Sequence, residues 1–238
     1  MESGTGDPVW RSSSPTSRLA VISALTLEAR IPKTVLGDRC PTVYVCGPGH
    51  ERAFAAAKRA IAAGADALIA WGLAGGLSPQ AGTAAVVLPK TVVRDAQTWR
   101  ADSAWRDRLA LVLGSEFQLI EGPLYSADRV LTTPQAKAAL AARSGAVAVD
   151  MESAAVAKAA AESGLPCVAL RVIADGPRDT LPENVEALVT EKGQTCYRSL
   201  VGFIGSPRRL RLLLNLAGKS RDARRQLKRV IEVLVRSA

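Results

Sequence analysis

Short apolar runs typical of buried strands alternate along this chain with alanine-rich runs typical of helices. The expected strands are Leu19–Ala24, Thr42–Cys46, Ala67–Trp71, Val86–Leu88, Thr91–Val93, Phe117–Tyr125, Ala146–Asp150 and Pro166–Ile173. The expected helices are Glu51–Ala63, Ala101–Leu113, Pro134–Arg143 and Ser153–Ser163. Because strands that alternate with helices form β-α-β units, the pattern predicts a three-layer α/β domain with a mixed, largely parallel central sheet flanked by helices.

The length of 238 residues fits one large domain with appendages. Residues 1–17 are rich in Ser, Gly and Pro and are expected to be a disordered leader, 18–204 the α/β domain and 205–238 a helical tail. The four cysteines form no CxxC pair, so neither a zinc site nor a disulfide framework is indicated. No run is apolar for long enough to span a bilayer, and we expect a cytoplasmic protein.

The tail carries most of the positive charge. Ten of the 31 Lys and Arg residues, but only two of the 22 acidic residues, lie from Pro207 to the C-terminus. Apolar residues recur at helical spacing in two sets, which predicts two basic amphipathic helices separated at Gly218. The sets are Leu210, Leu213, Leu214, Ala217 and Leu227, Val230, Ile231, Leu234. Either these helices pack on the domain, or they contact the inner face of an anionic membrane. The rest of the chain is nearly neutral, so nucleic-acid binding is not expected.

Carboxylates follow two of the expected strands. Asp150 ends the run Ala146–Asp150, Glu152 lies just before the small-residue helix that follows, and Asp175 follows Pro166–Ile173. Open α/β sheets bind ligands at the carboxyl ends of their strands, so these positions are candidates for a site. Each residue also has a structural alternative. Glu152 would only interact favourably with the helix dipole, and Asp175 would only form a turn.

Four segments, in order along the chain, resemble the purine nucleoside phosphorylase and nucleosidase superfamily. They are Ile22-Ser23-Ala24-Leu25-Thr26-Leu27-Glu28, Trp71-Gly72-Leu73-Ala74-Gly75-Gly76-Leu77, Asp150-Met151-Glu152 and Arg171-Val172-Ile173-Ala174-Asp175. The resemblance covers roughly residues 19–177 and implies an enzyme that breaks a base–ribose bond. It also implies a homo-oligomer of unknown order and no metal or redox cofactor.

The resemblance implies a role for each carboxylate. Glu152 is expected to accept hydrogen bonds from the ribose hydroxyls, with Met151 packed against the sugar. Asp175 is expected to hydrogen-bond the purine and protonate N7, and Glu28 to activate water. The alternative for Glu28 is a solvated glutamate on a first helical turn, and Asp150 is either functional or structural.

The remaining candidates concern the base and the nucleophile. Backbone amides at Ala74 and Gly75, within the glycine-rich segment after Trp71, are expected to bind the purine edge. Val130 lies near the place of the family's adenine-stacking phenylalanine. Ala70 and Leu73 stand where phosphorylases place phosphate-binding side chains. This favours water, although Arg30, Arg52 or Arg94 leave phosphate open as a co-substrate. The single histidine, His50, is expected to begin a helix without a catalytic role.

The tail resembles the hopanoid-associated phosphorylase branch, as do the segments Ala24–Arg30, Gly72–Pro79 and Arg171–Asp175. This resemblance implies adenosylhopane as the substrate. The apolar side chains of Leu25 and Leu27 are then expected to open a channel for the lipid. The alternatives are a methylthioadenosine or adenosylhomocysteine nucleosidase, another purine nucleoside phosphorylase, or a non-catalytic nucleoside-binding protein recruited to membranes.

Overall fold

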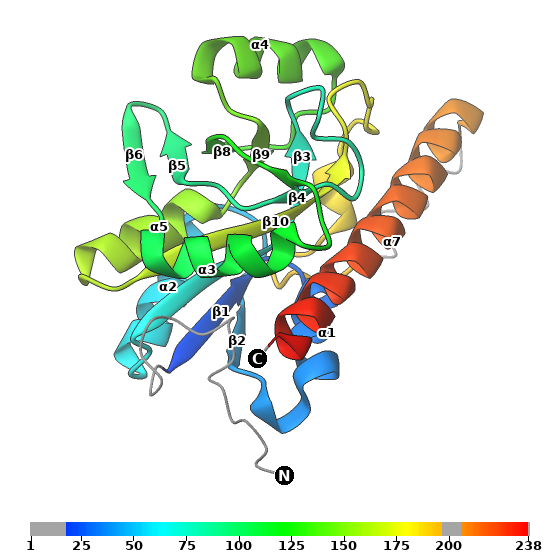
Figure 1. Cartoon of the computed structure of the whole chain (residues 1–238). Coiled ribbons are helices and arrows are strands. Elements are labelled where there is room, and N and C mark those ends of the chain that lie inside the picture. The colour runs from blue at the N-terminus through cyan, green and yellow to red at the C-terminus, as the bar shows by residue number, and fades with distance from the viewer. Residues whose placement is uncertain (1–17, 197–205, 238) are drawn as a thin grey trace.

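A computed structural model describes residues 18–196 and 206–237 (Figure 1). The expected leader, residues 1–17, lies outside the described residues. The strands are β1 (Leu19–Ser23), β2 (Thr42–Val45), β3 (Ala67–Gly76), β4 (Val86–Val87), β5 (Thr91–Arg94), β6 (Gln97–Arg100), β7 (Leu119–Ile120), β8 (Leu124–Ser126), β9 (Ala148–Asp150) and β10 (Cys167–Asp175). The helices are α1 (Thr26–Leu36), η1 (Gly37–Arg39), α2 (His50–Ala62), α3 (Ser103–Gly114), α4 (Pro134–Ser144), α5 (Ser153–Glu162), η2 (Val185–Leu188) and α7 (Pro207–Arg236).

The described strands form one mixed sheet of ten strands, as expected. β2, β1, β3 and β10 lie side by side in that order and run parallel, with β2 at an edge of the sheet. β9 joins the far end of β3 in the antiparallel sense, and β8 and β5 continue parallel to β9. Since β1, β3 and β10 run parallel, their carboxyl ends meet at one edge, which is where a site is expected.

Helices cover both faces of the sheet (Figure 1). Successive residues of β1 point to opposite faces: Ala20 and Ile22 pack against the alanines of α2 and α5, whereas Leu19 and Val21 face the layer that contains α3 and α7. Small residues on α2 and α5 allow these two helices to lie close to the sheet. The three-layer α/β prediction is confirmed.

The strand predicted to end at Trp71 is longer than expected and includes the glycine-rich segment. β3 continues to Gly76 because Leu73 and Ala74 stay in register with Val172 and Ile173 of β10. The extended run expected over 117–125 is interrupted between β7 and β8, and β6, a short antiparallel partner of β5, was not predicted.

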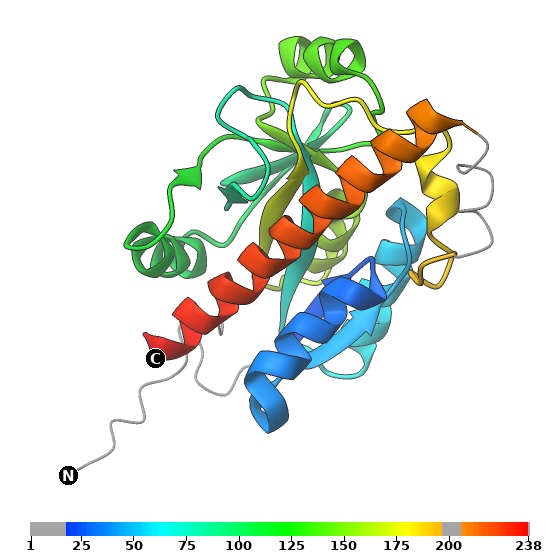
Figure 2. The same ribbon diagram turned by 90° about the vertical axis from the view of Figure 1, so that its right-hand side faces the viewer.

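α7 is one continuous helix, so the predicted break at Gly218 is wrong. A glycine inside a helix costs about 1 kcal/mol relative to alanine, and packing of the C-terminal half outweighs this cost. Leu227, Val230 and Leu234 are buried there against the sheet layer, beside α1 (Figure 2). The N-terminal half is less covered, and Leu214 is 64% exposed. Within the described residues, no helix has both the length and the apolar character needed to cross a membrane.

Candidate active site

A cavity of about 660 Å³ lies where β1, β3, β9 and β10 end, within the range of small-molecule sites. α7 and the segment after β10 form its outer wall. All eight residues predicted to form the site line this one cavity: Leu25, Glu28, Ala74, Gly75, Val130, Met151, Glu152 and Asp175.

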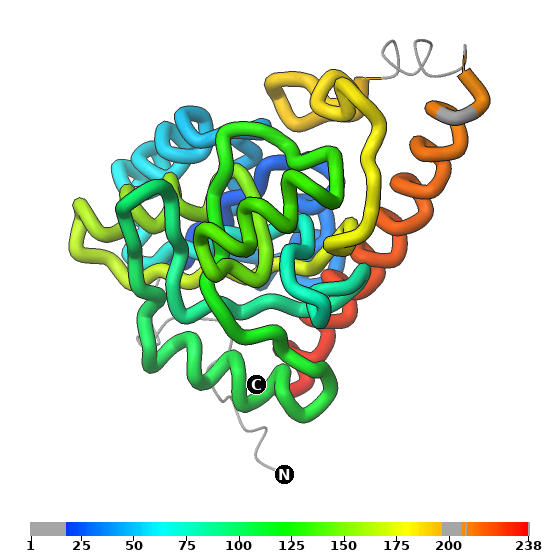
Figure 3. The backbone as a smooth tube through the Cα atoms, turned by 90° about the horizontal axis from the view of Figure 1, so that it is seen from above, coloured from blue at the N-terminus to red at the C-terminus, as the bar shows by residue number. Residues whose placement is uncertain are grey.

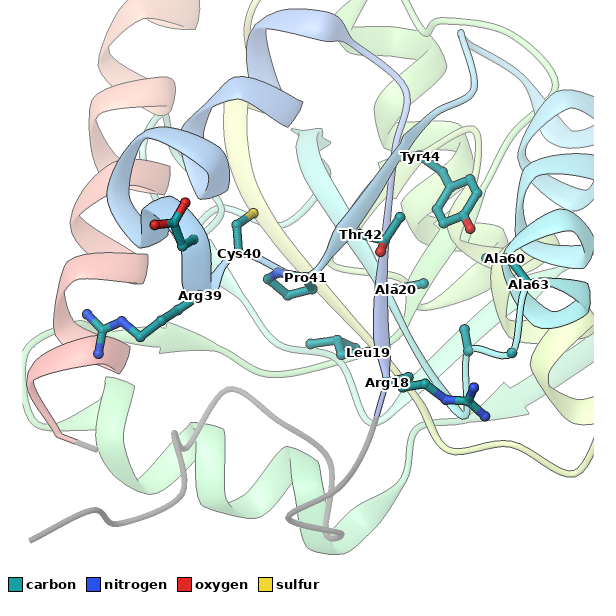
Figure 4. Close-up of a pocket in the computed structure, with 13 residues that line it drawn as sticks. Arg18, Leu19, Ala20, Arg39, Cys40, Pro41, Thr42, Tyr44, Ala60 and Ala63 are labelled. Carbon is teal, nitrogen blue, oxygen red and sulfur yellow. The ribbon is translucent and has the colours of Figure 1, made fainter.

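A second cavity of about 380 Å³ opens at the opposite end of the parallel strands (Figure 4). Leu19 and Thr42, at the starts of β1 and β2, line it together with Ala65, just before β3. None of the predicted site residues reaches it. The carboxyl-end cavity is therefore the candidate active site.

Glu28 is buried at the floor of the site, so the alternative of a solvated glutamate is wrong. It lies on the first turn of α1, where its Oε2 accepts a hydrogen bond from Ser23 Oγ at 3.1 Å. Its Oε1 accepts one from the backbone N–H of Leu73 at 3.2 Å. Burial raises the pKa of Glu28, and nearby Arg171 opposes this. A carboxylate whose pKa is raised toward neutral is a suitable general base.

Gly72 separates Glu28 from Arg171 and has to be glycine. A Cβ atom there would lie 2.5 Å from Glu28 Oε2 and 2.7 Å from Arg171 Nη1. Its φ of +150° also disfavours an L side chain. The missing side chain therefore leaves the carboxylate and the guanidinium as neighbours.

Asp150 holds the buried guanidinium in place. Its Oδ2 lies 2.6 Å from Arg171 Nη2 and also accepts the backbone N–H of Ser153 at 3.0 Å. Its Oδ1 accepts a hydrogen bond from Ser126 Oγ at 2.5 Å. Both oxygens are thus engaged by protein groups, which supports the structural interpretation of Asp150.

Glu152 stands at the start of α5, with its carboxylate in the cavity. Its Oε1 accepts the backbone N–H of Gly49 at 2.9 Å, and its Oε2 that of Met151 at 3.3 Å. Burial, assisted by the negative charge of Asp150, raises the pKa of Glu152 to about 7. This carboxylate can therefore change its charge near neutral pH.

Asp175 is the last residue of β10 and is 7% exposed. Lys137 of α4 donates a hydrogen bond from Nζ to Asp175 Oδ2 at 2.5 Å. Burial raises the pKa of Asp175, whereas the charge of Lys137 lowers it. On β3, Gly75 packs alongside, where a Cβ atom would lie 3.3 Å from Oδ2.

The cations that line the cavity are engaged by carboxylates or exposed. Lys137 and Arg171 pair with Asp175 and Asp150, and Arg52 pairs with Glu191 at 2.7 Å. Arg129 is exposed.

Other positions considered for anion binding offer no charged or polar side chain to the cavity. Ala70 is buried within β3 and Leu73 is apolar. Arg30 is exposed on α1, and Arg94 pairs with Asp128. His50 begins α2 as expected and does not line the cavity. Within 18–196 and 206–237, no group of acidic, Cys or His side chains is arranged to hold a metal ion.

The sequence from 29 to 204 matches the family model described as the Phosphorylase superfamily. This match covers more than half of the chain. The chain belongs to the Phosphorylase superfamily. Family membership confirms the predicted class of enzyme, a nucleosidase or nucleoside phosphorylase.

Solved structures of nucleosidases resemble this Phosphorylase superfamily member in fold. Futalosine hydrolase of Helicobacter pylori has a TM-score of 0.73 at 15% identity, over 93% of this chain and 98% of its own. A 5′-methylthioadenosine/S-adenosylhomocysteine nucleosidase of Neisseria meningitidis, solved with methylthio-immucillin-A, has a TM-score of 0.71 at 16% identity, over 92% and 99%. S-adenosylhomocysteine nucleosidase of Streptococcus pyogenes has a TM-score of 0.72 at 14% identity, over 95% and 99%. No match was found among curated proteins.

Sequence reasoning missed two buried cations of the site in this superfamily member. Arg171 was part of a recognised segment but received no role, and Lys137 was not noticed. A signal for Lys137 existed: it lies three residues before Leu140, on the same face of an otherwise small-residue helix. A lysine on the apolar face of a helix indicates a buried partner.

Proposed function

We propose that this protein hydrolyses the adenine–ribose bond of an adenosine whose 5′ carbon carries a large hydrocarbon, with adenosylhopane as the leading candidate. The observation that carries the proposal is one cavity that combines an extended apolar wall with three buried carboxylates, in addition to Asp150 in its ion pair with Arg171. The carboxylates are Glu28, Glu152 and Asp175, and the wall includes Leu25, Val130, Leu181, Val185, Val189 and Leu216.

The carboxylates supply the chemistry that glycosidic cleavage needs. As the bond to the base breaks, the sugar becomes oxocarbenium-like, and an ionised Glu152 at the ribose hydroxyls stabilises that positive charge. Asp175 gives a proton to N7, so that adenine leaves as a neutral molecule. Glu28 removes a proton from the water that attacks C1′.

Water is favoured over phosphate because the cavity lacks a free anion-binding side chain among its buried residues. Lys137 and Arg171 are already neutralised by buried carboxylates, and Arg52 by an exposed one. A phosphate beside Glu28 would also meet the like charge of that carboxylate once it ionises. These features support hydrolysis, and phosphate remains the alternative co-substrate.

The apolar wall supports a hydrocarbon on the 5′ carbon. Leu25 precedes Glu28 on one side of the cavity, while Leu216 reaches it from α7 and Val189 from the segment after β10. A small polar 5′ group would leave these side chains without an apolar partner. Burial of a hydrocarbon against them would contribute about 25 cal/mol per Å².

A substrate panel tests the proposal. Purified protein is incubated with adenosylhopane, methylthioadenosine, S-adenosylhomocysteine and adenosine, with and without phosphate, and adenine is quantified by chromatography. We expect the highest kcat/KM with adenosylhopane, no dependence on phosphate, and loss of adenine release in Asp175→Asn. Equal or better cleavage of methylthioadenosine would reject the lipid substrate and select the nucleosidase alternative.

That alternative, a methylthioadenosine or adenosylhomocysteine nucleosidase, is favoured by one observation. Two of the similar structures are nucleosidases of this kind, solved with methylthio-substituted ligands. Release of a ribose 1-phosphate would instead select a purine nucleoside phosphorylase. Binding of nucleosides without any turnover would select the non-catalytic alternative.

The N-terminal half of α7 supports a peripheral contact with the inner face of the cytoplasmic membrane. Arg209 and Arg211 are exposed beside Leu214, the combination that anionic lipid surfaces bind. In sedimentation with anionic vesicles, we expect Leu214→Glu to reduce binding. The matched control is Leu111→Glu, at a leucine that is 80% exposed on α3. Equal binding by both variants would reject this contact.

We also propose a homo-oligomer, which the family resemblance supports. Analytical ultracentrifugation of the purified protein tests this directly. A single species at the mass of one chain would reject it.

A further inference from the structure

Lys137 is a buried lysine for which the proposed chemistry has no role. Its side chain is 1% exposed, although lysines are almost never fully buried unless paired. Its Nζ donates to Asp175 Oδ2 at 2.5 Å, to the Gly176 carbonyl at 2.8 Å and to the Asp179 carbonyl at 3.2 Å. Three acceptors match the three protons of an ammonium group, so its hydrogen bonds are complete.

Two segments far apart in the sequence bring this lysine to Asp175. α4 begins at Pro134 after the capping hydroxyl of Thr133, and Lys137 lies one turn along, with its N–H bonded to the Thr133 carbonyl at 3.1 Å. The segment after β10 returns to the same place, where Leu181 N–H donates to the Thr132 carbonyl at 2.8 Å. Figure 3 shows this segment passing between α4 and α7. The backbone thus fixes both ends of the ion pair.

The lysine gives the two oxygens of Asp175 different surroundings. Oδ2 is bound to the ammonium group, whereas Oδ1 accepts no hydrogen bond from any residue that the structure describes. Asp175 lines the cavity, and the backbone of Gly75 leaves space beside its carboxylate. Oδ1 is therefore the oxygen available to a purine.

Charged groups surround Asp175 on several sides. Burial raises the pKa of Asp175, Lys137 lowers it most strongly, Asp179 raises it and Lys219 of α7 lowers it. Glu28, Glu152 and Arg171 line the same cavity from neighbouring strands and helices. Lys137 is the cation with the largest influence, and the only one of the two lysines that touches the carboxylate.

We propose that Lys137 is the positioning residue of the catalytic acid: it holds Oδ2 of Asp175 so that Oδ1 meets N7 of the leaving purine, and it stabilises the carboxylate that forms. The inference rests on the proposed function for the role of Asp175. In this step the Asp175 O–H proton moves to N7. The C1′–N9 bond breaks, and its electron pair goes to the purine, which leaves neutral. Lys137 keeps its own proton and faces a full negative charge when the step is complete.

The test compares two leaving groups. The full-length protein and its Lys137→Met variant are assayed with the adenine nucleoside and with a 4-nitrophenyl riboside that has the same 5′ group, because nitrophenolate leaves without a proton. For the adenine nucleoside, we expect kcat/KM at pH 7 to fall about 10- to 100-fold. We also expect the alkaline limb of its pH profile to move up by about one unit, because removal of the ammonium charge raises the pKa of Asp175. Cleavage of the nitrophenyl riboside is expected to change little.

The matched control is Arg143→Met, which removes an exposed charge from the same helix and is expected to leave both activities unchanged. If Lys137→Met does not fold, Lys137→Gln keeps a hydrogen-bonding group without the charge and is expected to show the same shift of the alkaline limb. Equal losses with both leaving groups, or an unchanged alkaline limb of the pH profile, would overturn the positioning role of Lys137. Neither result would contradict the proposed function. Wild-type protein that cleaves the nitrophenyl riboside but releases no adenine would overturn the proposed function.

Discussion

The two ends of the active-site cavity both contain buried carboxylates near a buried cation, but the cations are held differently. At the end proposed to bind the sugar (the sugar end), Arg171 is bound by Asp150 at 2.6 Å and by Ser153 Oγ at 2.9 Å. At the end proposed to bind the base (the base end), Lys137 binds Asp175 itself at 2.5 Å. Because Asp150 holds Arg171, the guanidinium lowers the pKa of Glu28 and Glu152 through its charge and leaves the oxygens of these carboxylates available. A cation in direct contact instead orients the carboxylate.

This difference matches the proposed tasks at the two ends. Glu28 has to take a proton from water, and burial raises its pKa toward the range in which it can do so. Asp175 has to give a proton in one direction, and direct contact with Lys137 fixes that direction. Substitutions at the sugar end and around its cation test this comparison.

The largest effect is expected from Glu28→Gln. The variant keeps the shape of the side chain but cannot accept a proton, so we expect kcat to fall by about 10²- to 10⁴-fold. The loss is expected with the adenine nucleoside and with the nitrophenyl riboside alike, because both reactions need activated water. If Glu28→Gln still cleaved the nitrophenyl riboside, which has the better leaving group, Glu28 would act in departure of the base and not in activation of water. That result would contradict the comparison between the two ends of the cavity.

Asp150→Asn is expected to destabilise the fold by about 3–5 kcal/mol, because it leaves the buried Arg171 guanidinium without its direct counter-charge. Urea unfolding followed by circular dichroism measures this loss. The matched control is Asp107→Asn, which removes an exposed carboxylate from Arg106, the other buried arginine of the described residues. Similar losses in the two variants would contradict the account of Asp150.

Glu152 is expected to make stability fall as pH rises. Its pKa is about 7 in the folded protein and near 4.5 when unfolded, so between these values the folded state binds more protons. The free energy of unfolding then decreases from pH 4.5 to 7, by about 2–3 kcal/mol for this group. Glu152→Gln is expected to remove that decrease, whereas Glu162→Gln, on an exposed site of the same helix, is expected to retain it. A slope common to all three proteins would exclude Glu152 as its source.

Ser23→Ala is expected to have the smallest effect. It removes one hydrogen bond to Glu28 Oε2, a bond that lowers the pKa of Glu28 and contributes about 0.5–1.5 kcal/mol. Because the base works when ionised, the acidic limb of the pH–rate profile is expected to move to higher pH by less than about one unit. A shift to lower pH would show that Ser23 does not stabilise the ionised base.

The layers and the approximate place of the site followed from local patterns. Alternating strands and helices indicated the sheet, and Glu152 and Asp175 were recognisable because each stands where an apolar strand ends. The two carboxylates lie near each other because β9 pairs in the antiparallel sense with the carboxyl end of β3, beside the end of β10, and the sequence pattern did not show this antiparallel pairing. Local patterns failed where tertiary contacts decide. Pairing with β10 extends β3 through its glycines, and packing on the sheet carries α7 through Gly218.

The ion pairs were less accessible to sequence reasoning. Lys137 and Asp175 are 38 residues apart, and they meet only because the segment after β10 folds back onto α4. Asp150 and Arg171 lie on strands that are not adjacent in the sheet. No pattern of period two or 3.6 encodes such contacts, so the roles of these cations required the three-dimensional arrangement.

The most direct test of the central claim is the fate of the ribose carbon. The protein is incubated with its adenine nucleoside in ¹⁸O-labelled water that contains phosphate, and the sugar product is analysed by mass spectrometry. If Glu28 activates water, the free sugar carries one ¹⁸O atom at C1′ and Glu28→Gln forms almost none of it. A sugar 1-phosphate as the main product, or labelled sugar formed at the wild-type rate by Glu28→Gln, would contradict the account.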